Sequence, residues 1–379
     1  MLPQMSHLYP RVVTKYPKAV TKEDDFTFKN KGLPHLNSNK QSLNKYTTTL
    51  LLLICDKFKY TINLKLWYSW IYRIRWGAEM KIIAAVNNKG GVGKTKLSEL
   101  LAEYAARFME KRILAIDFDP QCNFSNRYLC MEIDPATPEG TMPPIHPSFE
   151  DDMNYDDNWD GRSSIADTFY AESVLPYPTP IKNLDIAPGH HSKLLAVQEI
   201  KRTEIKEKIQ NHLNNFLSGD DVKECYDAVV IDTAPSKCPL TIGAIRAATH
   251  IVIPAVMEPK SIEGIYGMLQ LWKQERLRRD SSDSKLELVG ILPNQFKKNT
   301  TLHNDLLNDL KNHEIIGKYM LPVQLGHRIV FAEVDSQSST ENHTYTNIPS
   351  VFDLPTDNVA RKEAIEVCEH ILNRIFNHG

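Results

Sequence analysis

A short glycine-rich segment carries residues whose types and spacing suit chemistry on phosphate groups. The segment is Asn88-Lys-Gly-Gly-Val-Gly-Lys-Thr95. Its glycines let backbone N–H groups turn toward phosphate oxygens. The ammonium of Lys94 would reach the β- and γ-phosphates, and the hydroxyl of Thr95 would bind Mg²⁺. The segment therefore predicts a site for a nucleoside triphosphate together with Mg²⁺.

The flanking sequence predicts the elements that would hold this loop. Residues 81–87 are a short apolar run typical of a buried strand. After the loop, apolar residues recur at the spacing of an amphipathic helix. Strand, glycine loop and helix in this order form a P-loop, in which the helix N-terminus adds a partial positive charge. The helical stripe is Leu97, Leu100, Leu101, Tyr104, Ala105 and Phe108.

Two further predicted strands end in aspartates. Residues 112–116 lead into Asp117 and Asp119, and residues 226–231 lead into Asp232. Ligands of open α/β sheets bind at the carboxyl ends of the strands, so these carboxylates are placed for a ligand. Four apolar residues ending in Asp232 are typical of a Walker B strand, whose aspartate holds Mg²⁺ through water. Taken alone, the pair at 117 and 119 would better suit an acidic turn, but its place shortly after a P-loop favours the ligand site.

Strands and helices keep alternating along the rest of the chain. Residues 250–256 and 286–292 are apolar strand-like runs, and helical patterns follow at 261–279 and 302–310. Such alternation favours an α/β fold with a mostly parallel sheet and helices on both faces.

The order of these motifs resembles that of the ParA, MinD and Soj ATPases, a family that partitions plasmids and chromosomes. Lys89-Gly-Gly-Val-Gly-Lys-Thr95 is similar to the deviant Walker A box of that family, and Asp117-Phe-Asp-Pro-Gln-Cys-Asn123 to its DxDPQxN motif. The resemblance covers residues 80–335, and it implies a P-loop NTPase fold of the deviant Walker A type.

The resemblance also implies roles for individual residues in ATP hydrolysis. Lys89 would cross a nucleotide-sandwich dimer and contact the phosphates bound to the partner subunit, where a cation neutralises charge that develops at the γ-phosphate. Asp119 would orient the attacking water. Together with Lys94, these residues form the expected catalytic set.

The remaining implied roles concern Mg²⁺ and the nucleotide. Asp117 would support a Mg²⁺ shell held by Thr95 and Asp232. Lys96 stands where the family usually has Thr or Ser and would approach the α-phosphate, and Asn294 matches where relatives approach the base. The expected ATP-binding residues are Lys89, Gly90, Gly91, Val92, Gly93, Lys94, Thr95, Lys96 and Asn294.

The family's partners give further expectations. The resemblance implies a homodimer on ATP binding, non-specific DNA as a ligand, and a centromere-binding ParB-like protein that triggers hydrolysis. It also implies a cytoplasmic, nucleoid-associated protein. Arg276, Arg279 and Lys311 are the DNA-binding candidates, because basic residues gather at the matching predicted helices. A solvated helical face is the alternative for each of them.

Composition and charge divide the chain of 379 residues into two parts. Residues 1–79 carry 13 basic and 5 acidic residues, whereas residues 80–379 carry 32 and 42. We expect 1–79 to be a basic extension outside the core, although aromatics among its cations could also suit a nucleic acid or a membrane surface. Residues 80–379 would be the ATPase domain, with a Pro-rich and acidic insertion at 131–164.

Two other classes of protein share parts of this pattern. A MinD-like membrane switch needs a basic amphipathic anchor, but the last predicted helix carries Glu363, Glu366 and Glu369 opposite its apolar side, so we expect it to pack on the core. Binding to a membrane is therefore not expected. An electron-transfer ATPase would need a cluster ligand such as Cys238, but no matching second cysteine is evident. The six cysteines form no CxxC pair and suit reduced cytosolic thiols.

Overall fold

The structure is a computed structural model that describes residues 79–149, 159–279, 285–341 and 344–377. The expectations for the basic extension and for the acidic part of the insertion therefore lie outside the described residues. In the described part of the insertion, β3 (Glu132–Ile133) and β4 (Thr141–Met142) form a short antiparallel ladder.

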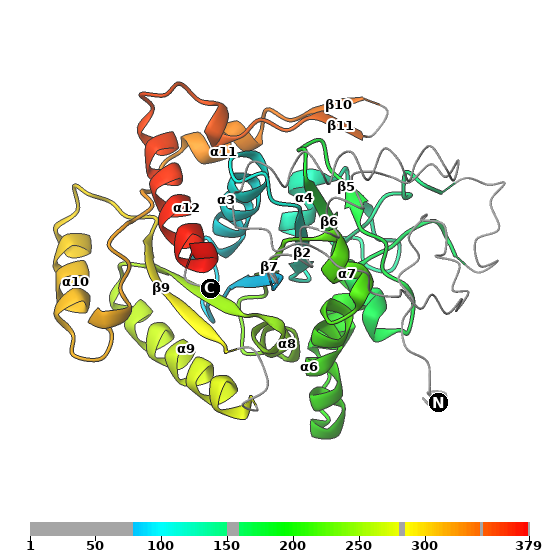
Figure 1. Cartoon of the computed structure of the whole chain (residues 1–379), viewed down its shortest axis with the longest axis horizontal. Helices are drawn as coiled ribbons and strands as arrows, with labels where there is room; N and C mark the ends of the chain where they lie inside the picture. Colours follow the sequence, from blue (N-terminus) through cyan, green and yellow to red (C-terminus); the bar gives the residue numbers. More distant parts are fainter. Residues whose placement is uncertain (1–78, 150–158, 280–284, 342–343, 378–379) are drawn as a thin grey trace, which may run out of the picture. The chain divides into compact units, whose positions relative to one another are not determined.

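A seven-stranded sheet forms the centre of the described chain, in the order β5-β6-β2-β7-β1-β8-β9 (Figure 1). The six strands from β6 to β9 pair in parallel, and β5 pairs antiparallel at one edge. The mostly parallel α/β fold predicted from the sequence is thus confirmed. The strands are β1 (Lys81–Ala85), β2 (Ile113–Phe118), β5 (Tyr177–Pro178), β6 (Leu184–Ala187), β7 (Ala228–Thr233), β8 (His250–Val256) and β9 (Glu287–Asn294).

The register of the central strands brings the predicted motifs to one edge of the sheet. Asp232 on β7 lies opposite Ala85 on β1 and also opposite Asp117 on β2. Because the glycine loop directly follows β1, the loop and both aspartates meet at the carboxyl ends of three adjacent strands.

Helices cover both faces of the sheet, as the alternation of side chains along β1 shows. Ile82 and Ala84 belong to one buried cluster with α6 (Thr203–Leu217), α8 (Pro239–Ala247) and α9 (Pro259–Arg278). Ile83 and Ala85 belong to the other cluster, with α3 (Lys94–Arg107) and α12 (Val359–Asn377). This alternation is the period of two that a strand buried on both faces requires.

The last helix, α12, packs on the core as expected from its sequence. Its apolar side, which includes Ala364, Cys368 and Ile371, is fully buried in the same cluster as α3. Within the described residues, no helix is both long and apolar enough to cross a membrane.

Shorter elements complete the described chain. They are α4 (Asn123–Tyr128), η1 (Ile165–Phe169), α5 (His191–Gln198), α7 (Asp220–Cys225), α10 (Thr301–Asn312), η2 (Gly317–Tyr319), α11 (Val330–Asp335), β10 (Ser339–Glu341), β11 (Thr344–Asn347) and η3 (Val351–Asp353).

Candidate nucleotide-binding site

The glycine loop between β1 and α3 has the backbone conformation of a phosphate cradle. Gly91 and Gly93 adopt positive φ angles of 70° and 80°, which glycine tolerates best. A Cβ at Gly91 would meet nothing within 4 Å, so the loop there faces open space. A Cβ at Gly93 would instead collide with the side chain of Asn294. The loop is thus open on one side and closely supported on the other.

Side-chain amides hold the loop. The Nδ2 of Asn294 donates to the carbonyl of Val92 at 2.7 Å, and the Nε2 of Gln295 donates to the carbonyl of Gly91 at 2.7 Å. Asn294 therefore supports the phosphate loop, and its contact with a base stays a prediction. Sequence reasoning missed Gln295, although its place directly after a strand end was a usable signal.

Lys94 lies within the site and is almost completely buried, with 6% of the residue exposed. Its Nζ donates to the carbonyl of Lys89 at 3.3 Å, across the loop. Burial lowers the pKa of Lys94, while the nearby carboxylates of Asp232 and Asp119 act in the opposite direction. The ammonium is therefore positioned to contact phosphates bound on the loop.

Thr95 and Asp232 form the centre of the expected Mg²⁺ site. The Oγ1 of Thr95 donates to Oδ2 of Asp232 at 2.6 Å, although the two residues are 137 positions apart. The other carboxylate oxygen, Oδ1, is buried without a hydrogen-bond partner. Burial, followed by the charge of Asp117, raises the pKa of Asp232 well above its ordinary value. A buried carboxylate with an unsatisfied oxygen is poised to accept a cation or a metal-bound water.

Asp117 and Asp119 occupy different surroundings in the loop after β2. Asp117 is fully buried, and its Oδ2 accepts hydrogen bonds from the N–H and the hydroxyl of Ser125, each at 2.7 Å. Burial raises its pKa to about 7. Asp119 is less enclosed, and its Oδ1 accepts from the N–H of Gln121 at 3.0 Å. The carboxylate of Asp117 is therefore held by Ser125 of α4, whereas that of Asp119 is held by the backbone of its own loop.

The donor set fits Mg²⁺. Among the described residues, no three His, Cys, Asp or Glu side chains are grouped to hold a metal by themselves. Mg²⁺ does not need such a cage, because it usually takes one or two protein oxygens together with waters and substrate phosphates. The Thr95 hydroxyl and the unsatisfied oxygen of Asp232 supply oxygens of that kind beside the loop.

Lys89 lies outside the buried part of the loop. Its side chain is 33% exposed, and its Nζ forms an ion pair of 2.7 Å with Oε2 of Glu258. Glu258 directly precedes α9 and was not among the sequence-based candidates. Its position just past the strand 250–256 was the signal that could have identified it.

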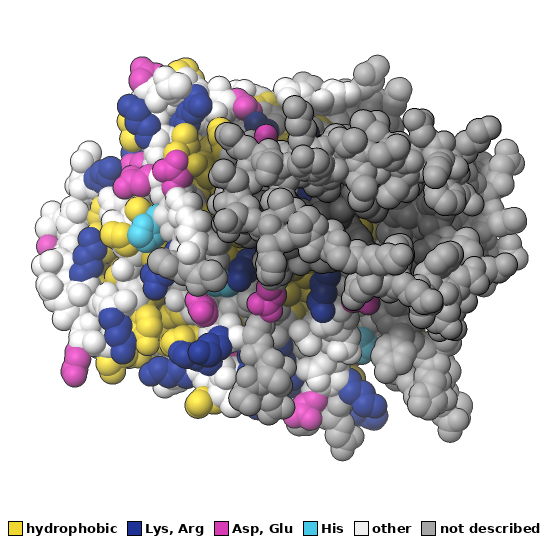
Figure 2. Space-filling view, viewed as in Figure 1, with side chains coloured by type: hydrophobic (Ala, Val, Ile, Leu, Met, Phe, Trp, Pro, Cys, Tyr) yellow, Lys and Arg dark blue, Asp and Glu magenta, His cyan; other side chains and the backbone are white. Residues whose placement is uncertain are grey.

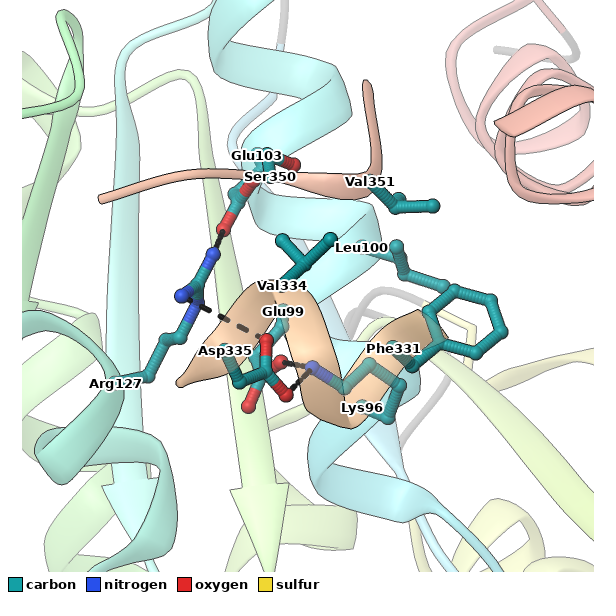
Figure 3. A pocket seen from close by; sticks show the side chains of 10 residues that line it. All are labelled: Lys96, Glu99, Leu100, Glu103, Arg127, Phe331, Val334, Asp335, Ser350 and Val351. Carbon is teal, nitrogen blue, oxygen red and sulfur yellow. Dashed lines mark hydrogen bonds and ion pairs between the residues drawn. The ribbon is translucent and has the colours of Figure 1, made fainter. Parts of the chain in front are cut away.

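Lys96 follows Thr95 on α3, and its side chain contacts a different set of residues. Its ammonium pairs with Glu99, one turn ahead on α3, and with Asp335 on α11 (Figure 3). Contact of Lys96 with the α-phosphate stays a prediction, and in this structure its ammonium is held by two carboxylates.

The three candidates for DNA binding have different surroundings. Arg276 and Lys311 are exposed at the ends of α9 and α10, and Figure 2 shows basic side chains gathered over the part of the surface where Figure 1 places α9. Arg279 is partly buried, and its Nη2 donates to the carbonyls of Ile245 (3.2 Å) and Arg246 (3.0 Å) in α8. DNA binding by any of these residues stays a prediction.

The cysteines and the start of α8 bear on the electron-transfer alternative. Cys238 is buried at the start of α8, with its Sγ 3.5 Å from the Oγ1 of Thr241. Cys122, Cys130, Cys238 and Cys368 are free thiols. Cys238 is therefore a buried thiol in contact with a hydroxyl, as expected for a core residue.

The fold and this site define a P-loop nucleotide-binding protein. A family model described as an AAA domain matches residues 80–288, more than half of the chain. The chain is 30% identical over 233 residues to the sporulation initiation inhibitor protein Soj of Bacillus subtilis, covering 62% of this chain and 79% of Soj. It is 25% identical over 265 residues to the chromosome-partitioning ATPase Soj of Thermus thermophilus, covering 69% and 88%.

Solved structures agree with this assignment at the level of the fold. An ATP complex of McdA from Cyanothece superposes with a TM-score of 0.56 at 16% identity, covering 78% of this chain and 98% of McdA. The chain belongs to the ParA/MinD family of P-loop ATPases, as its motifs predicted.

Proposed function

We propose that this protein is a partition ATPase. Its ATP-bound homodimer would bind DNA non-specifically, and a centromere-binding protein would stimulate hydrolysis and release. Support comes from the family, from the named relatives, and above all from the contrast between its two loop lysines. Lys94 is buried beside the phosphate loop, whereas Lys89 is partly exposed with its ammonium held by Glu258. A second cation at an accessible place suits contact with a nucleotide bound to another subunit.

The residues around the loop can be given roles in hydrolysis. Backbone N–H groups of the loop and Lys94 would hold the phosphates, and Thr95 and Asp232 would hold Mg²⁺, with Asp117 supporting the surrounding waters. When bound, Mg²⁺ neutralises charge on the β- and γ-phosphates. Asp119 would orient the attacking water, because its carboxylate is held beside the site rather than deep beneath it. Orientation of this kind is the main contribution a protein makes to phosphoryl transfer.

The proposed dimer requires Lys89 to change partners. In the single subunit described here, Glu258 neutralises its ammonium at 2.7 Å. Contact with phosphates of the partner subunit would replace this exposed ion pair, which is worth about 1 kcal/mol or less. The exchange is therefore energetically easy once ATP is bound on both sides.

The proposed binding of DNA depends on local charge. Residues 80–379 carry more acidic than basic residues, so attraction to phosphates must come from a basic patch rather than from the whole surface. Arg276 and Lys311 are exposed and suit this role better than Arg279, whose guanidinium is bound to carbonyls of α8.

The direct test is binding of the full-length protein to DNA duplexes of unrelated sequence with Mg-ATP, with Mg-ADP and without nucleotide. We expect Mg-ATP to tighten binding strongly, with little dependence on sequence and a steep loss of affinity as salt rises. Size measurements under the same three conditions should show a dimer with Mg-ATP. Equal DNA affinity in all three conditions would contradict the proposal.

A further inference from the structure

A buried cluster of charged side chains joins three segments on the α12 side of the sheet. Lys96 and Glu99 come from the start of α3, Arg127 from α4, and Asp335 from the end of α11. Figure 3 shows these side chains converging from the three helices. The cavity that they line has a volume of only about 10 Å³, which admits no more than a single water. The cluster is therefore not a ligand site, and its role must lie in what it connects.

Asp335 is the shared member of the cluster. Its Oδ2 lies 2.5 Å from the Nζ of Lys96, and its Oδ1 lies 3.6 Å from Nη1 of Arg127. One carboxylate on α11 thus contacts cations from α3 and α4, two helices that are distant from α11 in sequence. With 36% of its side chain exposed, Asp335 closes the cluster on the solvent side, whereas the side chain of Arg127 is 5% exposed.

The charges inside the cluster depend on one another. Arg127 also pairs with the buried Glu103, at 3.2 Å between Nη2 and Oε1. Burial raises the pKa of Glu99, and the ammonium of Lys96 opposes this shift. For Lys96, burial alone lowers the pKa, but the carboxylates of Glu99 and Asp335 outweigh burial and raise it. Removing Lys96 would leave the buried carboxylate of Glu99 without its ion-pair partner, so these charges depend on one another.

Two of the helices that meet in this cluster, α3 and α4, begin in the nucleotide site. Lys96 directly follows Thr95, which donates to Asp232. Arg127 lies in α4, whose Ser125 binds Asp117 through both its N–H and its hydroxyl. Any shift of α3 against α4 would therefore move Thr95 relative to Asp117, and the cluster opposes that shift from outside the site.

We propose that Lys96, Arg127 and Asp335 form a positioning clamp that holds the phosphate loop and the Asp117–Asp119 loop in register. This proposal rests on the proposed use of Thr95 and Asp117 in binding Mg-ATP and of Asp119 in orienting the attacking water. It gives α11, which lies beyond the matched residues 80–288, a role in the nucleotide site.

The test compares three variants of the full-length protein: Asp335→Asn, Lys96→Met and the double variant. Affinity for a fluorescent ATP analogue with Mg²⁺, steady-state KM and kcat, and thermal unfolding without nucleotide are measured for each. We expect Asp335→Asn to weaken binding of the Mg-nucleotide by about tenfold, as is usual for a residue that orients a metal ligand. We expect the double variant to lose no more affinity than the weaker-binding single variant, because both changes break the same clamp.

Two comparisons separate positioning from stability alone. Lys96→Arg keeps the charge and should retain at least half of the wild-type affinity. Glu172→Gln removes one carboxylate from the exposed ion pair with Lys193 and serves as the matched control. Wild-type affinity for the Mg-nucleotide in Asp335→Asn, together with a lowered melting temperature, would overturn the clamp. So would a double variant whose loss of affinity equals the product of the two single losses. Wild-type protein that binds no Mg-ATP would instead overturn the proposed function, and the clamp with it.

Discussion

The ammonium of Lys89 and the carboxylate of Glu258 lie 2.7 Å apart, although 169 positions separate the two residues in the chain. One belongs to the phosphate loop and the other directly precedes α9. The pair exists because β1 and β8 are neighbours in the sheet, so that the segments after both strands meet at one edge. It ties the lysine proposed to act on the partner subunit to its own subunit.

Weakening this ion pair should favour dimerisation. In Glu258→Gln, the amide holds Lys89 less strongly, so we expect the protein to dimerise about two- to fivefold more tightly with Mg-ATP, in line with the value of an exposed pair. Sedimentation of the protein over a concentration series would measure this change. Glu263→Gln, at an exposed position on α9, is the matched control. A weaker dimer in Glu258→Gln would show that Glu258 helps the lysine rather than restrains it.

Removing the carboxylate of Asp119 should separate binding from turnover. We expect Asp119→Ala to bind Mg-ATP, dimerise and bind DNA, while its rate of ATP hydrolysis falls by about 100-fold or more because the water is no longer oriented. Phosphate release and DNA binding are measured on the same preparation. Asp305→Ala, at an exposed position on α10, controls for the loss of one negative charge. Wild-type turnover in Asp119→Ala would rule out this role.

Two arginines three positions apart on α9 and its end should respond differently to the same substitution. Arg276 is exposed with its guanidinium carbon 5.5 Å from the ring centroid of Trp272, so Arg276→Ala should weaken DNA binding and lower the slope of log affinity against log salt by about one. Arg279 binds carbonyls near the end of α8, so Arg279→Ala should instead lower the free energy of unfolding by about 1–3 kcal/mol. DNA titrations at several salt concentrations and denaturation curves test both expectations. The assignment fails if the two variants change the same property equally.

Acid should destabilise the protein through His250, which lies at the start of β8. Burial lowers its pKa to about 4; the carboxylate of Glu287 opposes this shift and the charge of Lys81 adds to it. Between pH 4 and pH 6.5 the unfolded chain therefore binds a proton at this position that the folded protein does not, so stability falls as the pH falls through this window. The full effect is about 3 kcal/mol.

Replacing the imidazole with a neutral amide should remove this part of the acid sensitivity. We expect His250→Gln to lose about 2 kcal/mol less stability than the wild type between pH 7 and pH 4.5, in denaturation curves recorded at both values. His327→Gln, at an exposed histidine, is the matched control. Identical losses in His250→Gln and the wild type would contradict the assignment.

The phosphate loop and the strands that lead to Asp117 and Asp232 could be predicted from sequence because their signals are local. A glycine loop between an apolar strand and an amphipathic helix is defined within some twenty positions, and a strand that is buried on both faces is a continuous apolar run. Strand 250–256 was predicted with the bounds that the structure shows. The short edge strand β5 and the short helices α5 and α7 were not assigned, because their patterns are too brief to stand out. Helix α6 was also not assigned, although Ile205, Ile209, Leu213 and Phe216 recur at helical spacing.

The contacts around the site depended on which distant segments become neighbours. Sequence reasoning directed Lys96 and Asn294 to the nucleotide, whereas the structure gives the first an ion pair with Asp335 and the second a carbonyl of the phosphate loop. It treated Arg276 and Arg279 alike, although only the second reaches α8. The partners of a long polar side chain depend on the burial and charge of its surroundings, which the arrangement of distant segments around the sheet determines. The sequence by itself determined the loop, the strand-end carboxylates and the fold class, while the order β2-β7-β1-β8 decided which of those charges meet.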